Sequence, residues 1–582
     1  MHGRYLCIVH TAPAGASRPR ITLHPGFVRV LAADGVELYS DRPEALNDKA
    51  VEGWHLWGTV FQRDGYLRRP SDRKGSSTTI QPDALLRTVW GAFVGIAIET
   101  GGVVAGAKVR CVRDPLAHVP CYYCRHENCW LLASDVALLL AATGQKCAID
   151  WAELRDLLLF PGHFGSRTTL AGIFELMPGQ TMIIAQGAMR IVPAWSPCWH
   201  APSRAPDRSS LIASLQDALH QTHSALGKAY VNPLVTVSGG LDSAIVATEL
   251  ARHAEHLQLM TFYAQERRSD ERRYAELVAE TCKSALTFAR YALPDFSTCC
   301  RQEMFLPRPS HRTLGDLVNT RLLDQAFLGG HDALLNGYGG DNVFCMVAPP
   351  YALQDRIRDS GTVRAVLATL RDLKAITGTT YPQLGWHAVT STCRRWFGAP
   401  RGWTKSAQFL SEDAARAEAP KDPHPWIAGS AAARPGQRAH IAAIVHSHLY
   451  LERYSRQVSL ADISPLLMVP ILEACLSIPT WLWCESGIDR SPARRAATAL
   501  PPAIASRISK GTPVALHAAF FERHHLEIGE FLAEGMLAQA NILDADTVVA
   551  HCRRPPPTRD FDYLRLLELA DAEIWCRYWS GQ

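Results

Sequence analysis

The sequence predicts an α/β protein with two domains, the first rich in short strands and the second built from alternating strands and helices. Two patterns support this fold class. In residues 1–205, Gly, Pro and Asp interrupt short apolar runs at close intervals, which is typical of layered β structure. After residues 197–209, where Pro, Ser and Arg cluster without periodicity, apolar runs of strand length alternate with helical patterns. We therefore place the domains at residues 1–205 and 206–582.

Length, composition and charge limit the classes of protein to consider. At 582 residues the chain exceeds the size that one hydrophobic core serves. Its composition, 47% apolar and 20% charged, is that of a folded globular protein and excludes disorder, collagen and coiled coil as the main architecture. A net charge of +4 spread over this length is too weak a field to predict a nucleic-acid or membrane partner.

The targeting signals that would place the chain elsewhere are missing, so we expect a cytoplasmic protein. No stretch reaches the ~18 uninterrupted apolar residues that a membrane helix needs. The first residues lack the basic and apolar regions of a secretory signal. In a reducing compartment the 16 cysteines are expected to be free thiols.

Each predicted element follows from the spacing of apolar residues. In the first domain we expect strands at 5–10, 27–32, 55–61, 93–98 and 104–112, and helices at 135–142 and 151–158. In the second we expect helices at 211–226, 243–253, 271–282 and 317–328, between strands at 234–237, 258–263, 286–291 and 333–336. This alternation predicts a parallel sheet with helices on both faces. From 351 onward the pattern is mostly helical, with an irregular segment at 401–438 that predicts a mobile loop or lid.

The strongest functional signal is the segment Val235-Thr-Val-Ser-Gly-Gly-Leu-Asp-Ser243, in which a buried strand ends, two glycines turn the chain and a helix begins. The free N–H groups and partial positive charge of a helix N-terminus make such a turn a phosphate cradle. Its spacing is not that of a Walker loop. It resembles the S-G-G-x-D-S loop of the ATP pyrophosphatases, which implies that ATP binds here and that Asp242 holds Mg²⁺. The expected nucleotide-binding residues are Ser238, Gly239, Gly240, Leu241, Asp242 and Ser243.

A second glycine-rich loop, Asn336-Gly-Tyr-Gly-Gly-Asp341, also follows an apolar strand. In open α/β sheets ligands bind at the carboxyl ends of the strands, so the two loops can face one site. Mg²⁺ prefers one or two protein carboxylates together with phosphate oxygens, so Asp341 is expected as its second carboxylate. The other expected nucleotide-binding residues of this loop are Gly337, Tyr338, Gly339 and Gly340.

Most of the chain resembles the asparagine synthetase family. Residues 113–123 (RDPLAHVPCYY) are similar to its R-D-x-x-G-x-x-P-L-Y-Y, residues 132–138 (LASDVAL) to its F-A-S-E-x-x-A-L, and residues 176–179 (LMPG) to the turn that closes its N-terminal domain. The resemblance implies an N-terminal Ntn-type αββα glutamine-amidotransferase-like domain. It further implies a C-terminal α/β parallel-sheet ATP-pyrophosphatase domain, adenine nucleotide alpha hydrolase-like, with helical additions.

The first domain departs from the family pattern at its start. The glutaminase of this family needs a cysteine directly after Met1, because the freed α-amine works together with the thiol. Here His2 takes that position, so the glutaminase is expected to be degenerate. Cys7 would replace that cysteine only after removal of residues 1–6, and we expect it to be a buried thiol of the first strand. Cys121 and Cys124 have the spacing of a zinc pair but fall where the family has ordinary strand residues, so no zinc site is predicted there.

The second loop indicates the branch of the family. Asparagine synthetases carry acidic residues where this chain has Tyr338 and Asn342, and the Gly-Tyr-Gly loop looks more like the β-lactam synthetases and the lasso-peptide macrolactam synthetases. In those ring-closing enzymes a late lysine contacts the adenylate. Lys510, in Arg507-Ile-Ser-Lys-Gly511, is the candidate for this catalytic cation, with Arg507 a weaker one. Asp462 is a further candidate on the substrate side or as a base.

The resemblance implies a lasso-peptide cyclase that uses ATP and Mg²⁺. An Asp or Glu side chain of a ribosomal precursor peptide would be adenylated and then closed onto the peptide N-terminal amine, with release of AMP and pyrophosphate. The implied partners are the precursor peptide, a leader peptidase and a leader-recognition protein or domain. Three alternatives stay open: an asparagine synthetase using free ammonia, a β-lactam synthetase acting on a small amino acid, and a non-catalytic maturation scaffold. A tRNA-modifying pyrophosphatase is disfavoured by the weak net charge and by the first domain.

Overall fold

The computed structural model describes most of the chain. The described residues are 3–11, 19–43, 53–63, 80–99, 107–201, 207–263, 270–310, 315–346, 350–359, 362–386, 388, 405–420, 422–452, 454, 458, 460–507, 514–554 and 561–581. None of the helices in these ranges is both long and apolar enough to cross a membrane.

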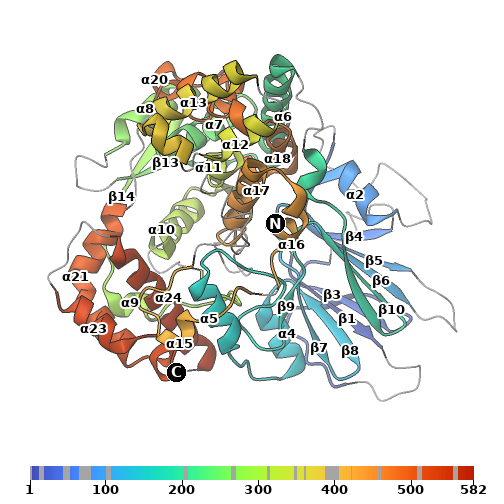
Figure 1. Cartoon of the computed structure of the whole chain (residues 1–582). Helices are drawn as coiled ribbons and strands as arrows, with labels where there is room; N and C mark the ends of the chain where they lie inside the picture. The colour runs from blue at the N-terminus through green and yellow to red at the C-terminus, as the bar shows by residue number, and fades with distance from the viewer. Residues whose placement is uncertain are drawn as a thin grey trace.

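Two antiparallel sheets form the first part of the chain and face each other (Figure 1). Apolar side chains from both sheets share one core, in which the ring centroids of Tyr5 and Trp57 are 4.8 Å apart. The first sheet, in spatial order, is β2 (Val28–Ala33), β3 (Val36–Ser40), β1 (Tyr5–His10), β8 (Cys129–Ala133), β7 (Tyr122–His126) and β9 (Phe174–Glu175). The second is β11 (Ala188–Pro193), β10 (Gln180–Ala185), β6 (Lys108–Arg113), β5 (Val89–Glu99) and β4 (Trp54–Gln62).

Helices cover the outer faces of both sheets. The first sheet packs its other face, including Leu6 and Ile8, against α4 (Val136–Thr143) and α5 (Trp151–Leu159). The second is covered by α6 (Arg208–Ala229), which follows the sheet in the chain, and by α18 (Val469–Leu476), which comes much later. Arg63, directly after β4, pairs with Glu473 of α18 at 2.7 Å. The short α2 (Pro82–Thr88) and the 3-10 helix η2 (Pro197–His200) complete this part.

The predicted parallel sheet is confirmed, with five strands among the described residues. Their order is β14 (Ala285–Arg290), β13 (Gln258–Tyr263), β12 (Pro233–Thr236), β15 (Ala333–Leu335) and β16 (Ala461–Ile463). Every neighbouring pair is parallel, and β12 lies in the middle, with Val235 opposite Leu259 and Leu335. The sequence did not predict β16, because its three residues form too short an apolar run.

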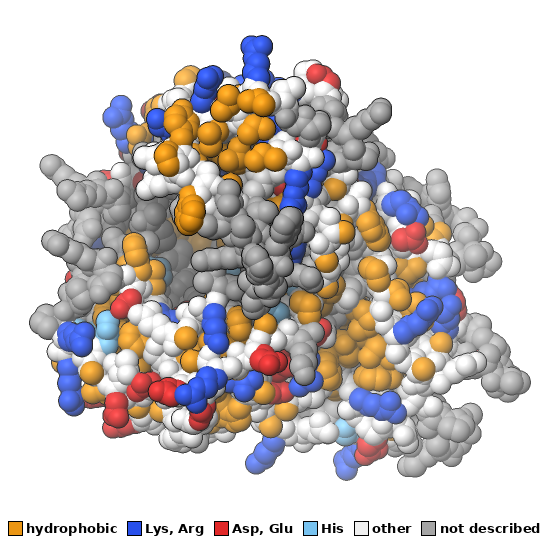
Figure 2. All heavy atoms as spheres, in the orientation of Figure 1, with side chains coloured by type: hydrophobic (Ala, Val, Ile, Leu, Met, Phe, Trp, Pro, Cys, Tyr) orange, Lys and Arg blue, Asp and Glu red, His pale blue; other side chains and the backbone are white. Residues whose placement is uncertain are grey.

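Helices surround this sheet and make up most of the rest of the chain. Those that come between or just after the first four strands in the sequence are α7 (Leu241–Leu250), α8 (Arg272–Cys282), α9 (Phe296–Cys299), α10 (Gly315–Leu328) and α11 (Gly340–Val343). Later ones are α12 (Tyr351–Arg358), α13 (Val363–Thr377), α15 (Glu412–Ala415), α16 (Pro425–Gly429), α17 (Pro435–His448), α19 (Ser491–Ala496), α20 (Pro502–Ala505), α21 (Val514–Ala533), α22 (Met536–Gln539), α23 (Ala545–Cys552) and α24 (Asp562–Ser580). The short 3-10 helices are η4 (Ser430–Ala432), η5 (Pro465–Leu467), η6 (Thr480–Leu482) and η7 (Glu485–Gly487). Figure 2 shows this face of the molecule hollowed between the upper helices and the group of α21, α23 and α24.

The prediction of a mobile loop or lid at 401–438 is wrong for the part that the structure describes. Residues 405–420 and 422–438 contain three short helices and the start of α17. Trp426 is 2% exposed and donates its indole N–H to the carbonyl of Pro178 at 3.1 Å. The small residues that suggested irregularity allow this segment to pack closely between the two parts of the chain.

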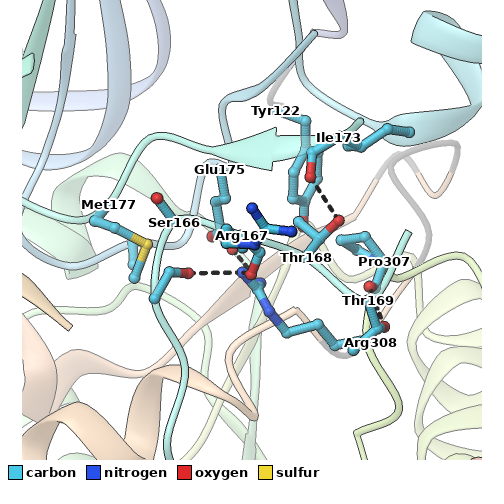
Figure 3. A network of polar contacts seen from close by, with 12 residues as sticks. Tyr122, Ser166, Arg167, Thr168, Thr169, Ile173, Glu175, Met177, Pro307 and Arg308 are labelled. Atoms are coloured by element: carbon cyan, nitrogen blue, oxygen red, sulfur yellow. Dashed lines mark hydrogen bonds and ion pairs between the residues drawn. The ribbon is translucent and has the colours of Figure 1, made fainter. Parts of the chain in front are cut away.

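A buried network of charges joins the two parts (Figure 3). Arg308, before α10, forms an ion pair with Glu175 of β9 and donates to the carbonyls of Gly165 and Arg167, both at 2.8 Å. Arg113 of β6 donates to the other oxygen of Glu175 at 2.6 Å. Burial works against the Glu175 carboxylate, but Arg308 and Arg113 outweigh it and hold its pKa below the usual value. The network therefore holds the two parts together through ionised groups.

Candidate active site

The first loop has the geometry of an anion cradle. It runs from the end of β12 into α7, whose ten residues are all buried. Gly239 has a φ of +69°, and a Cβ there would lie 2.6 Å from Tyr274 Cβ. Gly240 is the N-cap of α7 and offers no side chain to cap it, so the first N–H groups of the helix remain for a ligand.

Two serines fix the shape of the first loop from within. The Ser238 backbone N–H donates to Ser243 Oγ at 3.1 Å, and the two hydroxyl oxygens are 3.3 Å apart. Ser243 Oγ in turn donates to the Gly240 carbonyl at 3.3 Å. Asp242 lies in the first turn of α7 and is buried, with an exposed fraction of 5%. Hydrogen bonds therefore connect the predicted residues from Ser238 to Ser243 within a single loop.

The second loop packs directly on the first, as the sequence predicted. A Cβ on Gly337 would lie 2.4 Å from the backbone nitrogen of Ser243, and one on Gly340 would lie 2.6 Å from the Asp242 carboxylate. Gly339 has a φ of +81° and faces Leu467. Because each glycine is placed where a side chain would collide, the loops can approach closely only with this composition.

This close approach predicts the effect of Gly337→Ala. The added methyl group meets backbone of the first loop, which cannot rotate away, so we expect ATP affinity to fall at least about tenfold. Gly385→Ala is the matched control, because a Cβ there meets no atom within 4 Å. Binding of a fluorescent ATP analogue to both variants measures the effect. Equal affinities of the two variants would contradict the close packing of the loops.

Two side chains of the second loop are tied to α17. Tyr338 Oη donates to the carbonyl of Ser447 at 3.0 Å, and Asn342 Nδ2 donates to that of Ala443 at 2.6 Å. These are the positions at which asparagine synthetases carry acidic residues. Here they anchor the loop on a helix, so α17 sets the position of the second loop.

A single guanidinium joins the two aspartates that were expected to hold the metal. Arg490 Nη1 lies 3.0 Å from both carboxylate oxygens of Asp242 and 2.5 Å from Asp341 Oδ1. Arg490 Nε donates to Asp489 at 2.7 Å. Burial works against the charged guanidinium, but the attraction of Asp242, Asp489 and Asp341 outweighs it and raises the pKa of Arg490. The two predicted carboxylates thus share one cation.

The residues at this point fit a divalent cation. Asp242 is buried, whereas the Asp341 side chain is 39% exposed, so one carboxylate is enclosed by protein and the other is accessible to solvent. Mg²⁺ is usually held by one or two carboxylates with phosphate oxygens completing its shell. The guanidinium of Arg490 shows that the pair attracts and accommodates positive charge.

Arg507 lies at the back of the first loop. Its Nη1 donates to the Gly239 carbonyl at 2.8 Å, and its Nη2 lies 2.5 Å from Glu271 Oε1. Its guanidinium stacks over Tyr274 at 3.7 Å from the ring centroid. These contacts make Arg507 a positioning residue of the loop. The main candidate for the catalytic cation, Lys510, lies outside the described residues.

The structure places the two loops and Arg507 together, and adds Arg490, which the sequence analysis missed. No local signal identifies Arg490, because it is 149 residues after Asp341 and belongs to no motif. Arg490 has a left-handed backbone conformation with a φ of +54°, and its side chain contacts both loops. This conformation can be recognised only in the structure. Asp462 lies on the edge strand β16, opposite Leu334.

The cysteines of the first part have structural positions. Cys7 is 0% exposed in the middle of β1, and burial raises the pKa of its thiol well above the ordinary value, so the expectation of a buried thiol is confirmed. Cys121 belongs to the core between the sheets, whereas Cys124 belongs to the core beneath α4 and α5. The two thiols therefore lie on opposite faces and cannot share a metal. Within the described ranges no cluster of three or more His, Cys, Asp or Glu side chains is arranged to hold a metal ion.

Two solved structures are weakly similar to this chain. One, described as the allosteric regulatory enzyme of purine biosynthesis, has 9% identity and a TM-score of 0.18 over 58% of this chain and 83% of that one. The other, the glutamine phosphoribosylpyrophosphate amidotransferase from B. subtilis with ADP and GMP, has 12% identity and a TM-score of 0.15 over 50% and 71%. At these scores neither supports any inference.

A search of curated proteins returned no match. Residues 214–577, more than half of the 582-residue chain, match the model of the asparagine synthase family. This range contains both glycine loops, both aspartates and Arg490. The chain therefore belongs to the asparagine synthase family.

Proposed function

We propose that the protein is an ATP-dependent, AMP-forming carbon–nitrogen ligase that closes a macrolactam in a ribosomal precursor peptide. The observation that supports this most directly is the contact between the two glycine loops, with Asp242 and Asp341 on one shared cation. ATP and Mg²⁺ are its cofactors. The family membership supports the ligase class, and the macrolactam is the finer part of the proposal.

The reaction has two steps. An Asp or Glu carboxylate of the peptide attacks the α-phosphorus of ATP, the bond from that phosphorus to the bridging oxygen breaks, and pyrophosphate leaves. The peptide N-terminal amine then attacks the acyl carbon of the adenylate, AMP departs with the electrons of the C–O bond, and the amine loses a proton. Because both groups belong to one molecule, the second step is effectively unimolecular when the peptide is held in place.

The residues of the loops hold the phosphates and the metal. The N–H groups at the start of α7 and the backbone from Ser238 to Ser243 would bind the β and γ phosphates. Asp242 and Asp341 would hold Mg²⁺, which when bound supplies positive charge to the phosphate oxygens. Arg490 would turn from the carboxylates to the phosphates when the metal is in place. Lys510, three residues after Arg507 in the sequence, is proposed as the cation that stabilises charge during attack by the amine.

Three features favour ring closure over ammonia transfer. His2 replaces the cysteine that a glutaminase of this family requires, and Cys7 is buried in a strand. Tyr338 and Asn342 replace acidic residues of the asparagine synthetases and bind α17 instead. We therefore propose that the first part is a degenerate Ntn-type domain with a structural role, at residues 1–205, and that the ligase occupies residues 206–582. A leader peptidase and a leader-recognition protein or domain are its proposed partners, in the cytoplasm.

Pyrophosphate release from Mg²⁺-ATP tests this proposal. The assay is run with a candidate precursor peptide and its leader protease, and separately with aspartate and ammonium. Peptide-dependent release, together with loss of one water from the peptide mass, is the expected result. Release driven by aspartate and ammonium would assign an asparagine synthetase, and absence of release with either substrate would leave a maturation scaffold.

A further inference from the structure

Arg494 lies in α19, one helical turn after Arg490, which is the N-cap of that helix. We propose that Arg494 is a positioning residue of the nucleotide site, which holds the backbone of Arg490 and that of Arg507 beside the glycine loops. This inference rests on the proposed function, since it assigns to the ligase a residue that acts on the nucleotide through two other arginines. Its basis is one guanidinium whose three nitrogens donate to carbonyl groups of both segments.

The first of these contacts fixes the backbone at Arg490. Arg494 Nε donates at 2.7 Å to the carbonyl of Asp489, which belongs to the peptide group that precedes Arg490. The Arg494 backbone N–H donates to the carbonyl of Arg490 at 3.2 Å. Arg490 has a left-handed φ of +54°, a conformation that a residue other than glycine keeps only where its surroundings hold it. Arg494 therefore stabilises the backbone from which Arg490 reaches Asp242 and Asp341.

The other two nitrogens fix the backbone at Arg507. Arg494 Nη1 donates at 2.8 Å to the carbonyl of Ala505, the last residue of α20. Arg494 Nη2 donates to the carbonyl of Arg507 itself at 2.9 Å. The side chain of Arg507 in turn donates to the Gly239 carbonyl in the first loop. Arg494 thus holds the main chain from which that side chain extends, and only Arg507 stands between it and the first loop.

The shape of an arginine suits this set of acceptors. A guanidinium carries five N–H groups in one rigid plane, whereas a lysine carries its donors on a single nitrogen at the end of a flexible stem. The Arg494 side chain is only 7% exposed, so little water competes for its donors. Three donors at fixed mutual angles therefore set the position of residue 507 relative to residue 489.

The charge of Arg494 is unfavourable for stability alone. Burial lowers the pKa of Arg494 and the positive charge of Arg490 lowers it further, against the attraction of Asp489 and Asp242. A buried cation beside a second cation costs free energy, and a well-packed apolar side chain of similar volume would avoid that cost. Such a side chain would lack the three donors. The guanidinium therefore serves the placement of the two segments.

The affinity of the full-length protein for a fluorescent ATP analogue, measured with Mg²⁺, tests this role without a peptide substrate. We expect Arg494→Met to weaken binding at least about tenfold, because Arg490 and Arg507 lose their common support. We expect Arg494→Lys to weaken it at least about fivefold, since this variant keeps the positive charge but not the planar set of donors.

Double-mutant cycles distinguish positioning from a purely structural role. Arg494→Met is measured in wild type, in Arg490→Met and in Arg507→Met. In each of the two variant backgrounds it should weaken binding only about threefold or less, because part of what Arg494 supports has already been removed. A residue that only stabilises the fold would give the same factor in all three backgrounds. Thermal unfolding shows which variants are folded, and Arg494→Lys completes the same cycles where Arg494→Met does not fold.

Arg565→Met is the matched control for the loss of a buried guanidinium. The Arg565 side chain is 6% exposed and joins α24 to distant segments, since its Nη2 donates to the carbonyls of Leu158 at 2.7 Å and Ser406 at 3.1 Å. We expect this variant to unfold at a lower temperature than wild type but to bind the analogue with an affinity within about twofold of the wild-type value.

The outcomes separate this inference from the proposed function. Equal factors in all three backgrounds, or an equal loss of affinity in Arg494→Met and Arg565→Met, would overturn the role of Arg494 and leave the ligase unaffected. Coupled losses in a protein that releases no pyrophosphate with peptide or with aspartate and ammonium would support Arg494 and contradict the ligase. Absence of analogue binding in wild type would contradict both.

Discussion

Replacing Asp242 by asparagine is expected to slow pyrophosphate release from ATP at least about a thousandfold. Asp242 is buried in the first turn of α7 and shares the nitrogen of Arg490 with Asp341. The amide has the same shape but lacks the negative charge that attracts a cation to this point. The measurement is the rate of pyrophosphate release at saturating Mg²⁺-ATP, in the presence of the peptide substrate.

Asp489→Asn is the matched control for this variant. Asp489 also accepts from Arg490, at 2.7 Å, but belongs to neither glycine loop. We expect a loss of less than about tenfold, because both loop carboxylates remain. If both variants slow pyrophosphate release equally, the effect comes from losing a partner of Arg490. It then gives no support to Asp242 as a metal ligand. Wild-type activity in Asp242→Asn would exclude the proposed metal site.

The glycine loops could be predicted from the sequence because their chemistry is local. A buried strand, a pair of glycines and a helix start within nine residues already determine where backbone N–H groups point. The meeting of the two loops followed from a general property of parallel sheets, since β12 and β15 are neighbours and end at the same edge. Gly337 and Gly340 show the result, each in contact with the other loop.

The contacts between distant segments could not be predicted in this way. Arg490 reaches the aspartates from a segment without a motif, and its role depends on one backbone turn. Arg308 contributes to a buried network in the first part from 133 residues beyond Glu175. Trp426 lies in a segment whose Ala, Pro, Gly and charged residues predict irregular structure, yet it is buried and donates to the carbonyl of Pro178. The composition of a segment predicts only its local conformation. The positions of these residues depend on contacts with residues that are distant in the sequence.

Replacing Glu175 by glutamine is expected to lower the free energy of unfolding by about 3–5 kcal/mol. Glu175 is 7% exposed and lies between two guanidinium groups, those of Arg113 and Arg308. Without its charge, the two buried guanidinium groups lose the carboxylate that both of them contact. Chemical denaturation monitored by tryptophan fluorescence measures the change. The double variant Glu175→Gln/Arg308→Met should recover part of the loss, because it removes one of the stranded charges.

The stabilisation by the Glu175 carboxylate depends on pH, and the direction of its pKa shift determines how. The pKa of Glu175 is held below its usual value in the folded protein, and an unperturbed glutamate titrates near ~4.3. Its contribution is therefore complete above that pH and is lost as the pH falls through the lower folded value. We expect the difference in stability between wild type and Glu175→Gln to be constant near neutral pH and to shrink below about pH 4.

The exposed ion pair of Asp83 and Arg87 is the control for the loss of stability in Glu175→Gln. These side chains are 45% and 69% exposed and lie 2.5 Å apart, so Asp83→Asn should cost less than about 1 kcal/mol. A loss of that small size in Glu175→Gln would show that the buried network adds nothing to stability beyond an exposed ion pair. A large loss would show that the buried contact between Arg308 and the first part of the chain contributes substantially to the stability of the protein.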